Sequence, residues 1–573
     1  MLNPTRGRWI SNPGWSYGIR NSNIRGRSLW CFFEYIRVSI AKPKALPSPH
    51  EHLSRGYGQT KQQRKKMPEQ EVSKLHYVNI NARGTFTRWP IERLSEYHTT
   101  PEDVDRIFEN LRAEKPEHIV LFVHGGLVGE KKGMEAVSRF HRFYNEKSKV
   151  YPIGFIWETD PLTAFIGGVE DNFKNSEMKG LFGIVRRLVL KKLGMEDRFN
   201  SSVLDQADLE AFTRDYRAEE NTLDVEWLMH KAKRYKRYSL KKLEAEMNQE
   251  LTLGHIGGEN LKADRNGFVA ESFGSMAKSI TIAARCIYRF ARRRHHGFFT
   301  TILEEIYRAL RIAKVFGPEE VADHLWSQMK RQAKDMWKKN VGIQGEDQHA
   351  GRYFLDRLQV YMQEMKEQNM PVAFEAVAHS AGSIVICEML RCIQANRSLE
   401  HVRLNNVIFL APAVTCSEFE DTVMAYPDLY ARFRMFTMQK EKELEDRLLN
   451  ARPLRGIYPS SLLYLVSGLC EDGRLLGRLN FKGDVCILGL HQHISNEGPY
   501  ADIPILQRIH AFLNDETVEQ RLVLTPTPEG TPPGFCGQAI DHGDFDNDGD
   551  EHHQTLNRYE GSIRQSIDVM FGG

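Results

Sequence analysis

The chain has 573 residues, of which 41% are hydrophobic and 27% are charged, and its formal net charge is +3. These values are typical of a soluble globular protein, and the nearly neutral charge gives no reason to expect a nucleic-acid partner. No run of 18 or more apolar residues occurs, so we expect no membrane-spanning helix. The length allows two or more domains, or one domain with insertions.

Residues 1–66 differ in composition from the rest. The first 50 residues contain eight Lys or Arg but a single acid, Glu34. A mitochondrial transit peptide has this bias. We favour instead a disordered basic extension, or residues that precede the true translation start at Met67. The eight cysteines form no CxxC pair and no metal-like spacing, which favours reduced, buried thiols. We therefore expect a cytoplasmic protein, with mitochondrial targeting as the alternative.

From His76 onward, strand and helix patterns alternate. Residues 99–114 begin with a Thr N-cap, a Pro in the first turn and early acids, which together predict a helix. The patterns predict strands over 77–86, 118–127 and 152–157, and a further helix over 131–147. This β-α-β alternation predicts a parallel sheet with helical crossovers.

Residues 158–369 have mostly helical patterns with clusters of Lys and Arg. Residues 181–194 are amphipathic and cationic, which is typical of a helix that lies on a membrane surface. Neighbouring acids balance the basic clusters, so we favour helices of a cap domain with solvated polar faces. No nucleic-acid-binding motif accompanies the charge.

A serine lies at the centre of the sequence Ala378-His379-Ser380-Ala381-Gly382. An apolar strand pattern over 372–377 precedes it, and a helical pattern over 384–390 follows. Strand, tight turn and helix are the context of the G-x-S-x-G nucleophile elbow, with Ala378 at the position of the first glycine. Ser380 is therefore the candidate nucleophile. The alternative is that this stretch is ordinary core and Ser380 is inert.

The C-terminal third continues the alternation. It predicts strands over 405–414 and 432–438, a short strand that runs into a loop over 537–548, and a closing amphipathic helix over 555–571. His542 follows the last strand, and a serine nucleophile needs such a general base. In α/β-hydrolases the order is Ser, acid, His, which His542 satisfies. His552 and His553 are less favoured alternatives near the final helix.

The residues that stabilise an oxyanion are expected in two places. One N–H group comes from the residue after the nucleophile, Ala381, and the other from a loop after an early strand. The loop His124-Gly125-Gly126-Leu127 is of this kind, since glycine lets the backbone approach the substrate. We assign the second donor to Gly126 or Leu127.

The motifs VHGGL, AHSAG and DHG together resemble the α/β-hydrolase superfamily, on the lipase and esterase side. More narrowly, the chain is similar to uncharacterised hydrolases with a strand that ends in WE (157–158), an HSAG elbow and an HGxFDND loop (542–548). The resemblance implies a mostly parallel sheet flanked by helices, and a serine hydrolase with a catalytic triad. It implies no particular substrate.

The acid of the triad should follow the strand that ends at Met438. The family pattern places its first Asp at Lys440, where no carboxylate stands, and the later acids match Glu443 and Asp446. We expect Glu443 or Asp446 to be the acid, although a charged helix surface explains both equally simply.

The sequence DFDNDGD (544–550) matches the start of a calcium-binding EF-hand loop. Counted from Asp544, the twelfth position should be Glu but is Thr555. We therefore expect turns and helix capping from these acids, and no metal.

Together these patterns predict an α/β-hydrolase core over 75–157 and 370–573, with a helical cap over 158–369. The expected function is a serine hydrolase that cleaves an ester, lipid esters included, through an acyl-enzyme and without a cofactor. The expected partner is a small-molecule or lipid ester, with peripheral contact to a membrane as a further option and no nucleic acid. The alternative function is a weak hydrolase-fold scaffold whose basic cap binds a protein or a membrane.

Overall fold

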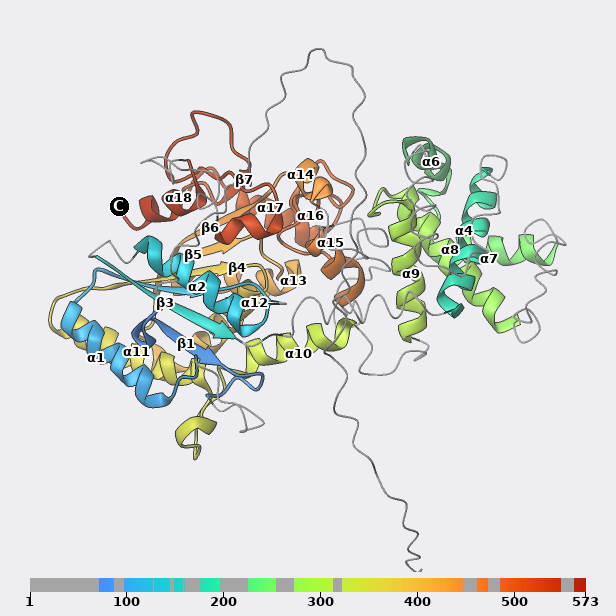
Figure 1. The fold of residues 1–573 in the computed structure, drawn as a ribbon. Coiled ribbons are helices and arrows are strands. Elements are labelled where there is room, and N and C mark those ends of the chain that lie inside the picture. Colours follow the sequence, from blue (N-terminus) through green and yellow to red (C-terminus); the bar gives the residue numbers. More distant parts are fainter. Residues whose placement is uncertain are drawn as a thin grey trace, which may run out of the picture. The chain divides into compact units, whose positions relative to one another are not determined.

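A computed structural model describes most of the chain (Figure 1). The described residues are 72–86, 97–126, 128–144, 149–157, 159, 176–195, 225–253, 273–312, 322–446, 461–471, 485–547 and 561–572. All of them lie in one compact unit, Glu69–Gly573.

The described part contains one sheet, many α-helices and several single turns of 3-10 or π-helix. The strands are β1 (Tyr77–Ile80), β2 (His118–Val123), β3 (Val150–Trp157), β4 (Ala373–His379), β5 (Leu404–Leu410), β6 (Tyr430–Met438) and β7 (Leu522–Thr525). The α-helices are α1 (Pro101–Glu114), α2 (Glu130–Tyr144), α4 (Ser176–Leu193), α6 (Val225–Ala232), α7 (Leu240–Thr252), α8 (Phe273–Ala291), α9 (Phe298–Ile312), α10 (Ala322–Asp335), α11 (Ala350–Glu367), α12 (Gly382–Gln394), α13 (Cys416–Phe419), α14 (Lys440–Glu445), α15 (Leu462–Leu465), α16 (His491–Ile494), α17 (Pro504–Leu513) and α18 (Ile563–Met570). The single turns are η1 (Lys74–His76), η4 (Lys233–Tyr235), η6 (Gly345–Asp347), η7 (Arg397–Leu399), η8 (Glu420–Met424), η9 (Pro427–Leu429), η11 (Val466–Cys470) and η12 (His542–Asp546).

The seven strands form one parallel sheet in the order β1-β3-β2-β4-β5-β6-β7 (Figure 1). The predicted parallel sheet with helical connections is therefore confirmed. β4 lies at the centre, between β2 and β5, with Val123 opposite Ala378 and Leu410 opposite His379. The end of β4 that leads to Ser380 is thus flanked by strands on both sides.

Alternating residues of the strands face two separate layers of helices, as the two-residue repeat of a strand requires. In β2, Ile119, Leu121 and Val123 belong to the buried cluster that includes α1, α11, α12 and α17. Val120 and Phe122 belong to the other cluster, which includes α2 and α18. Both faces of the sheet are therefore covered, which explains why its strands are continuously apolar.

Helix α1 begins where the sequence predicts. Thr100 Oγ1 accepts a hydrogen bond from Asp103 N (3.3 Å), and Asp103 Oδ2 accepts one from Thr100 N (3.0 Å). This capping box satisfies N–H groups that the first turn of a helix leaves without partners. The predicted helix start is confirmed.

The helices between β3 and β4 fall into two sets. Helices α4, α7 and α9 pack around α8, whereas α10 packs against α12 and α11 packs against α1. The apolar face of α4, with Val185, Leu188 and Val189, is buried inside the protein, and Lys192 forms ion pairs with Glu246 and Glu250 of α7 (2.6 and 2.5 Å). Among the described residues, no helix has both the length and the apolar character needed to cross a membrane.

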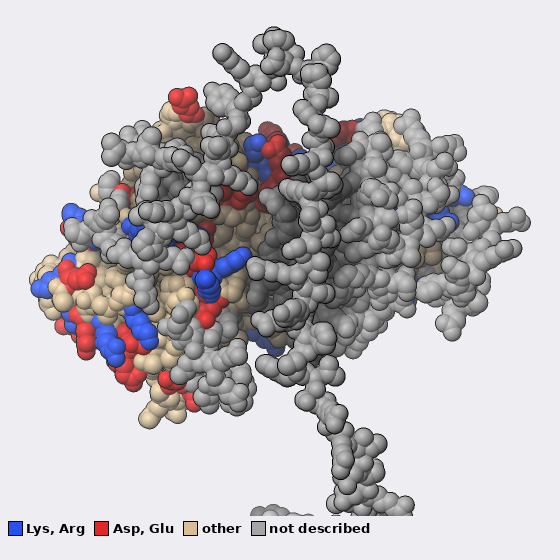
Figure 2. Space-filling view, viewed as in Figure 1, with Lys and Arg blue, Asp and Glu red and all other residues tan. Residues whose placement is uncertain are grey.

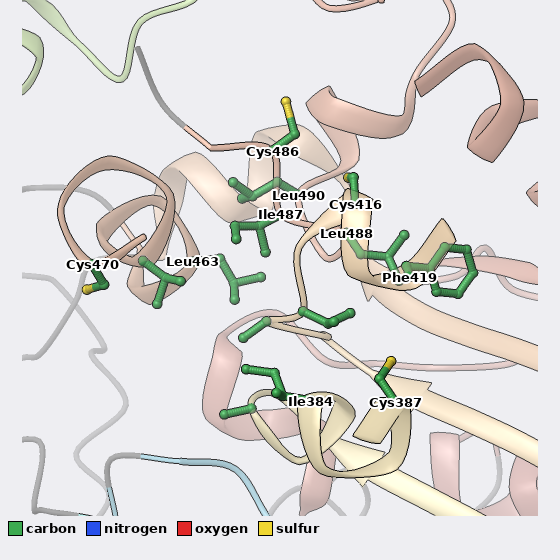
Figure 3. Close-up of a cluster of buried hydrophobic side chains, with 14 of the residues drawn as sticks. Ile384, Cys387, Cys416, Phe419, Leu463, Cys470, Cys486, Ile487, Leu488 and Leu490 are labelled. Atoms are coloured by element: carbon green, nitrogen blue, oxygen red, sulfur yellow. The ribbon is translucent and has the colours of Figure 1, made fainter. Parts of the chain in front are cut away.

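Buried thiols line the core beside α12 (Figure 3). Ile384 and Cys387 of α12 lie near Leu463, Leu488 and Cys416 from segments far along the chain. All seven cysteines of the described residues are buried thiols. The prediction of buried thiols is confirmed for these seven, and Cys31 lies outside the described residues. On the face drawn in Figure 2, acidic and basic residues are interspersed, in keeping with the small net charge.

The strand predicted at the start of residues 537–548 is wrong. Those residues form an irregular segment followed by η12, and the last strand of the sheet is instead β7. β7 is only four residues long and is followed by Pro526, which cannot donate a hydrogen bond to a neighbouring strand. Of the predicted closing helix, residues 555–560 lie outside the described residues, and α18 occupies most of the remainder.

Candidate active site

The candidate residues follow four strands at the same edge of the sheet. Gly126 comes after β2, Ser380 directly after β4, Asp446 after β6 and α14, and His542 after β7. Because the strands are parallel, their carboxyl ends lie at one edge, where α/β sheets bind ligands. The sheet thus brings together residues that are far apart in the sequence.

Ser380 occupies a sharp turn between β4 and α12. Its φ angle is +51°, in the left-handed region, and such a conformation costs about 1–3 kcal/mol in a residue with a side chain. Ser380 N donates to Leu410 O of β5 (2.8 Å), and Ser380 O accepts from Ser383 Oγ (2.6 Å). At position 382 only glycine fits, since a Cβ atom there would lie 2.5 Å from Val123 O of β2. The flanking strands therefore hold the strained turn in place.

The imidazole of His542 contacts the hydroxyl of Ser380. His542 Nε2 lies 2.9 Å from Ser380 Oγ, and both side chains are buried. Burial and the nearby His379 imidazole lower the pKa of His542 well below its ordinary value. A neutral imidazole at this distance can accept the serine proton, so the pair has the geometry of a nucleophile and its general base.

Acidic side chains fold the turn that carries His542. Asp541 Oδ1 accepts a hydrogen bond from Gly543 N (2.8 Å), and Asp544 Oδ2 accepts from Ile540 N and Asp541 N (3.0 and 3.2 Å). These bonds cap η12 at its first turn. Asp541 and Asp544 are thus engaged with the backbone, which is what the sequence predicts for the acidic loop.

Asp446 is the predicted acid that contacts His542. Its Oδ2 accepts a hydrogen bond from the main-chain N–H of His542 (3.1 Å). Burial, with smaller contributions from Asp541 and Asp544, raises the pKa of Asp446 to about 6 against the effect of that bond. His542 Nδ1 is buried and has no hydrogen-bond partner among the described residues. The carboxylate therefore holds the base through its backbone in this structure.

Glu443, the other predicted acid, does not contact His542 in the described structure. It is fully buried in α14, and its carboxyl accepts a hydrogen bond from the hydroxyl of Ser461. Burial, opposed by this bond and reinforced by the charge of Asp446, raises its pKa to about 8. Glu443 is thus a neutral carboxylic acid at neutral pH.

His379, the residue before the candidate nucleophile, also contacts the base. Its Nε2 donates a hydrogen bond to the main-chain oxygen of His542 (3.0 Å), and its Nδ1 lies 3.8 Å from Asp546 Oδ2. Asp546 in turn pairs with Arg139 of α2 (3.3 Å). In the sequence, His379 and Asp546 stand out only as parts of the HSAG and FDND motifs. The two motifs point to these residues, but they do not show that the side chains of His379 and Asp546 lie close to each other.

Two main-chain N–H groups beside Ser380 have no acceptor within the part of the chain that the structure describes. Among the described residues, neither Ala381 N nor Gly126 N donates a hydrogen bond. The loop of Gly126 lies against the elbow, because a Cβ on Gly126 would be 2.9 Å from Ala381 Cβ and 2.3 Å from Met329 Sδ. Unpaired donors near a nucleophile can stabilise a developing oxyanion. Leu127, the alternative donor, lies outside the described residues.

His124 fixes the loop that contains Gly126. Its Nδ1 donates to Gly125 O (2.6 Å), and its Nε2 accepts from Trp157 N (3.3 Å). The indole N–H of Trp157 donates to His124 O (3.0 Å). Complete burial lowers the pKa of His124 to about 4, so the ring is neutral and structural.

The remaining predicted candidates are not among the described residues. His552, His553 and residues 548–550 of the acidic loop lie outside the described residues. Within the described ranges, no group of three or more His, Cys, Asp or Glu side chains is arranged to hold a metal ion.

A comparison with known protein families gives a match. Residues 337–459 match the sequence model of a family described as an alpha/beta hydrolase of unknown function (DUF900). The matched segment contains β4, the elbow, β5, β6 and the acids of α14, but not His542. No curated protein and no solved structure matches the chain. The match supports a hydrolase and agrees with the parallel sheet described above.

Proposed function

Since the chain has the α/β-hydrolase fold, we propose that it is a serine hydrolase that cleaves carboxylic esters through an acyl-enzyme. The observation that carries the proposal is the 2.9 Å contact between Ser380 Oγ and His542 Nε2 at a strained strand-to-helix turn. Nucleophile and base within hydrogen-bond reach are the signature of covalent catalysis by serine.

In the first step, Ser380 Oγ attacks the ester carbonyl carbon while His542 Nε2 takes its proton. The carbonyl oxygen becomes an oxyanion, which the N–H groups of Ala381 and Gly126 stabilise. Each such donor contributes about 10²–10³ in rate in enzymes of this kind. The protonated His542 then gives its proton to the leaving alcohol, which leaves the acyl group on Ser380.

Water releases the acyl group in the second step. His542, neutral again, removes a proton from water as the water attacks the acyl carbon, and then returns the proton to Ser380 Oγ. The products are a carboxylic acid and an alcohol. No step in this sequence calls on a metal or an organic cofactor.

We assign the role of the acid to Asp446 rather than Glu443. Asp446 contacts the residue that carries the base, whereas Glu443 is bonded to Ser461 and is neutral at neutral pH. A carboxylate beside His542 orients the residue and favours the imidazolium that forms during the reaction.

One observation favours the alternative of a weak enzyme that acts as a scaffold. His542 Nδ1 has no hydrogen-bond partner among the described residues, whereas an efficient triad orients this atom with its acid. We rank the scaffold function second, because catalytic hydrogen bonds are often poorly aligned in the absence of substrate.

A fluorophosphonate probe, which modifies activated serines, tests the proposal. The full chain should be labelled, Ser380→Ala should lose all labelling, and His542→Ala should lose nearly all of it. Circular dichroism should show that both variants are folded. Absence of labelling on folded native protein would reject the serine mechanism and leave the scaffold as the better interpretation.

A further inference from the structure

A basic cavity is lined by segments from between β3 and β4 together with segments that follow β6. Its volume is 1230 Å³, and its walls are formed by α6, η4, the turn after α8, α14 and residues 492–502. The volume exceeds the range of about 300–1,000 Å³ that is usual for small-molecule pockets. A ligand larger than a simple inorganic ion therefore fits it.

The cations of this cavity outnumber its acids. Within the wall, Arg293 pairs with Glu226 (3.5 Å) and Arg294 pairs with Asp502 (2.5 Å). The remaining cations form no ion pair with any described residue, and only one acid, Glu497, is left to face them. These cations are Lys233, Lys236, Arg292 and Lys440.

Arg292 lies in the wall of the cavity and forms no ion pair with any described residue. Its guanidinium stacks on the ring of Tyr288 (3.6 Å to the centroid) and donates to Tyr238 O (3.1 Å). Burial lowers its pKa, and the adjacent Arg294 acts in the same direction, whereas Tyr288 and Asp502 act to raise it. An anion in the cavity would relieve this repulsion.

Apolar side chains share the cavity with these cations. Leu444, which is 48% exposed, lines the cavity, and the largely buried Met229 forms part of its wall. Leu444 lies one helical turn from Lys440, so the two residues share a face of α14. The cavity thus offers charge to one part of a ligand and apolar surface to another.

We propose that this cavity binds an amphiphile that carries a phosphate group. Four cations with only one unpaired acid suit a multiply charged anion, because phosphate presents several oxygens to Lys and Arg. The lysines are exposed, so a dissolved ligand can reach them. The proposal concerns binding alone and holds whether or not Ser380 is a nucleophile.

The cavity borders the helix that leads to Asp446. Lys440 and Leu444 face the cavity, while Asp446, directly after the same helix, accepts the main-chain N–H of His542. A ligand held by α14 therefore sits on the element that positions Asp446.

Calorimetric titration of the full chain with two ether lipids tests the proposal. The probes are 1-O-octylglycerol 3-phosphate and 1-O-octylglycerol, which differ only in the phosphate and contain no ester to hydrolyse. We expect the phosphate lipid to bind at least about tenfold more tightly, and added salt to weaken it. Inorganic phosphate alone should bind more weakly than the phosphate lipid.

Two matched variants locate the site. The variant Lys233→Gln/Lys236→Gln/Lys440→Gln should weaken the phosphate lipid about tenfold or more, because three charges are lost. The control Lys241→Gln/Lys334→Gln/Lys366→Gln removes three exposed lysines outside the cavity and should retain native affinity. If the first variant does not fold, Lys233→Gln/Lys236→Gln is measured instead.

Three results would overturn the proposal. The first is equal affinity of the native chain for the two lipids. The second is an equal loss of affinity for the phosphate lipid in the cavity variant and the control variant. The third is binding of inorganic phosphate as tight as that of the phosphate lipid. The last result would assign the cavity to free phosphate. Failure of fluorophosphonate labelling would leave the proposal untouched, so the two hypotheses are tested separately.

Discussion

The side chain of His379 donates a hydrogen bond to the main-chain oxygen of His542 (3.0 Å), so the residue before the candidate nucleophile holds the candidate base. Because β4 ends at His379 and the elbow follows at once, the same strand positions both partners. The distance of 2.9 Å between Ser380 Oγ and His542 Nε2 thus depends on a contact that the triad itself does not contain.

His379→Phe should therefore slow catalysis without removing any group of the triad. Phe cannot donate to His542 O, and a misplacement of about 1 Å can cost about 10²-fold in rate. We expect labelling of Ser380 by fluorophosphonate to slow by about tenfold to a hundredfold. His379→Gln retains an N–H donor and should recover part of the rate. Equal rates for Phe and Gln, with unchanged melting temperatures, would contradict this role.

The sequence predicts which residues meet at the candidate site better than it predicts the individual bonds between them. Ser380, His542 and the HGG loop follow from motifs and from chain order, because each motif carries its local structure with it. The sequence does not decide between Glu443 and Asp446 as the acid, because the two lie within one helical turn of each other. Nothing in the sequence shows which of the two carboxyl groups is buried against Ser461. The bond between His379 and His542 joins distant segments, which no local pattern reports.

The edge of the sheet was equally hard to predict. β7 has four residues, Leu522–Thr525, which are too few to show a clear repeat. The apolar residues near 539 predict a strand, but the structure has an irregular segment there. Ala539 is buried with α18 rather than within the sheet. Burial, not strand pairing, explains the apolar pattern there.

Asp446→Asn should lower the rate far more than Glu443→Gln. Replacement of the triad carboxylate by an amide lowers the rate of serine hydrolases by up to about 10⁴-fold, because the amide cannot support the imidazolium. Glu443 is neutral at neutral pH, so Gln preserves its charge. Rates of ester hydrolysis, measured near pH 7, should therefore fall strongly in the first variant and little in the second. The reverse order would assign the acid to Glu443.

The rate should fall as the pH drops through about 6. Burial raises the pKa of Asp446 to about 6, whereas the pKa of His542 is lowered well below its ordinary value. On acidification Asp446 is therefore the first of the two to be protonated, and the support for the imidazolium is lost. The profile of kcat/KM against pH should show this acid limb in the native chain. In the Asp446→Asn variant, the residual kcat/KM should not fall near pH 6. If the same fall near pH 6 remains in this variant, Asp446 is not the group that causes it.

Buried Glu443 should make the folded state less stable as the pH rises. Its pKa is raised from 4.5 to about 8, so between these values the folded chain keeps a proton that the unfolded chain has lost. Stability contributed by this group is thus complete below pH 4.5 and declines by about 1.4 kcal/mol per pH unit up to about pH 8.

Glu443→Gln removes this dependence because the amide does not titrate. The native chain should lose stability relative to the Gln variant between about pH 5 and pH 8, measured as the difference in their thermal unfolding midpoints. Glu441→Gln, at an exposed position of the same helix, is the matched control and should follow the native chain. A difference between native and Glu443→Gln that does not change with pH would show that Glu443 is ionised in the folded protein.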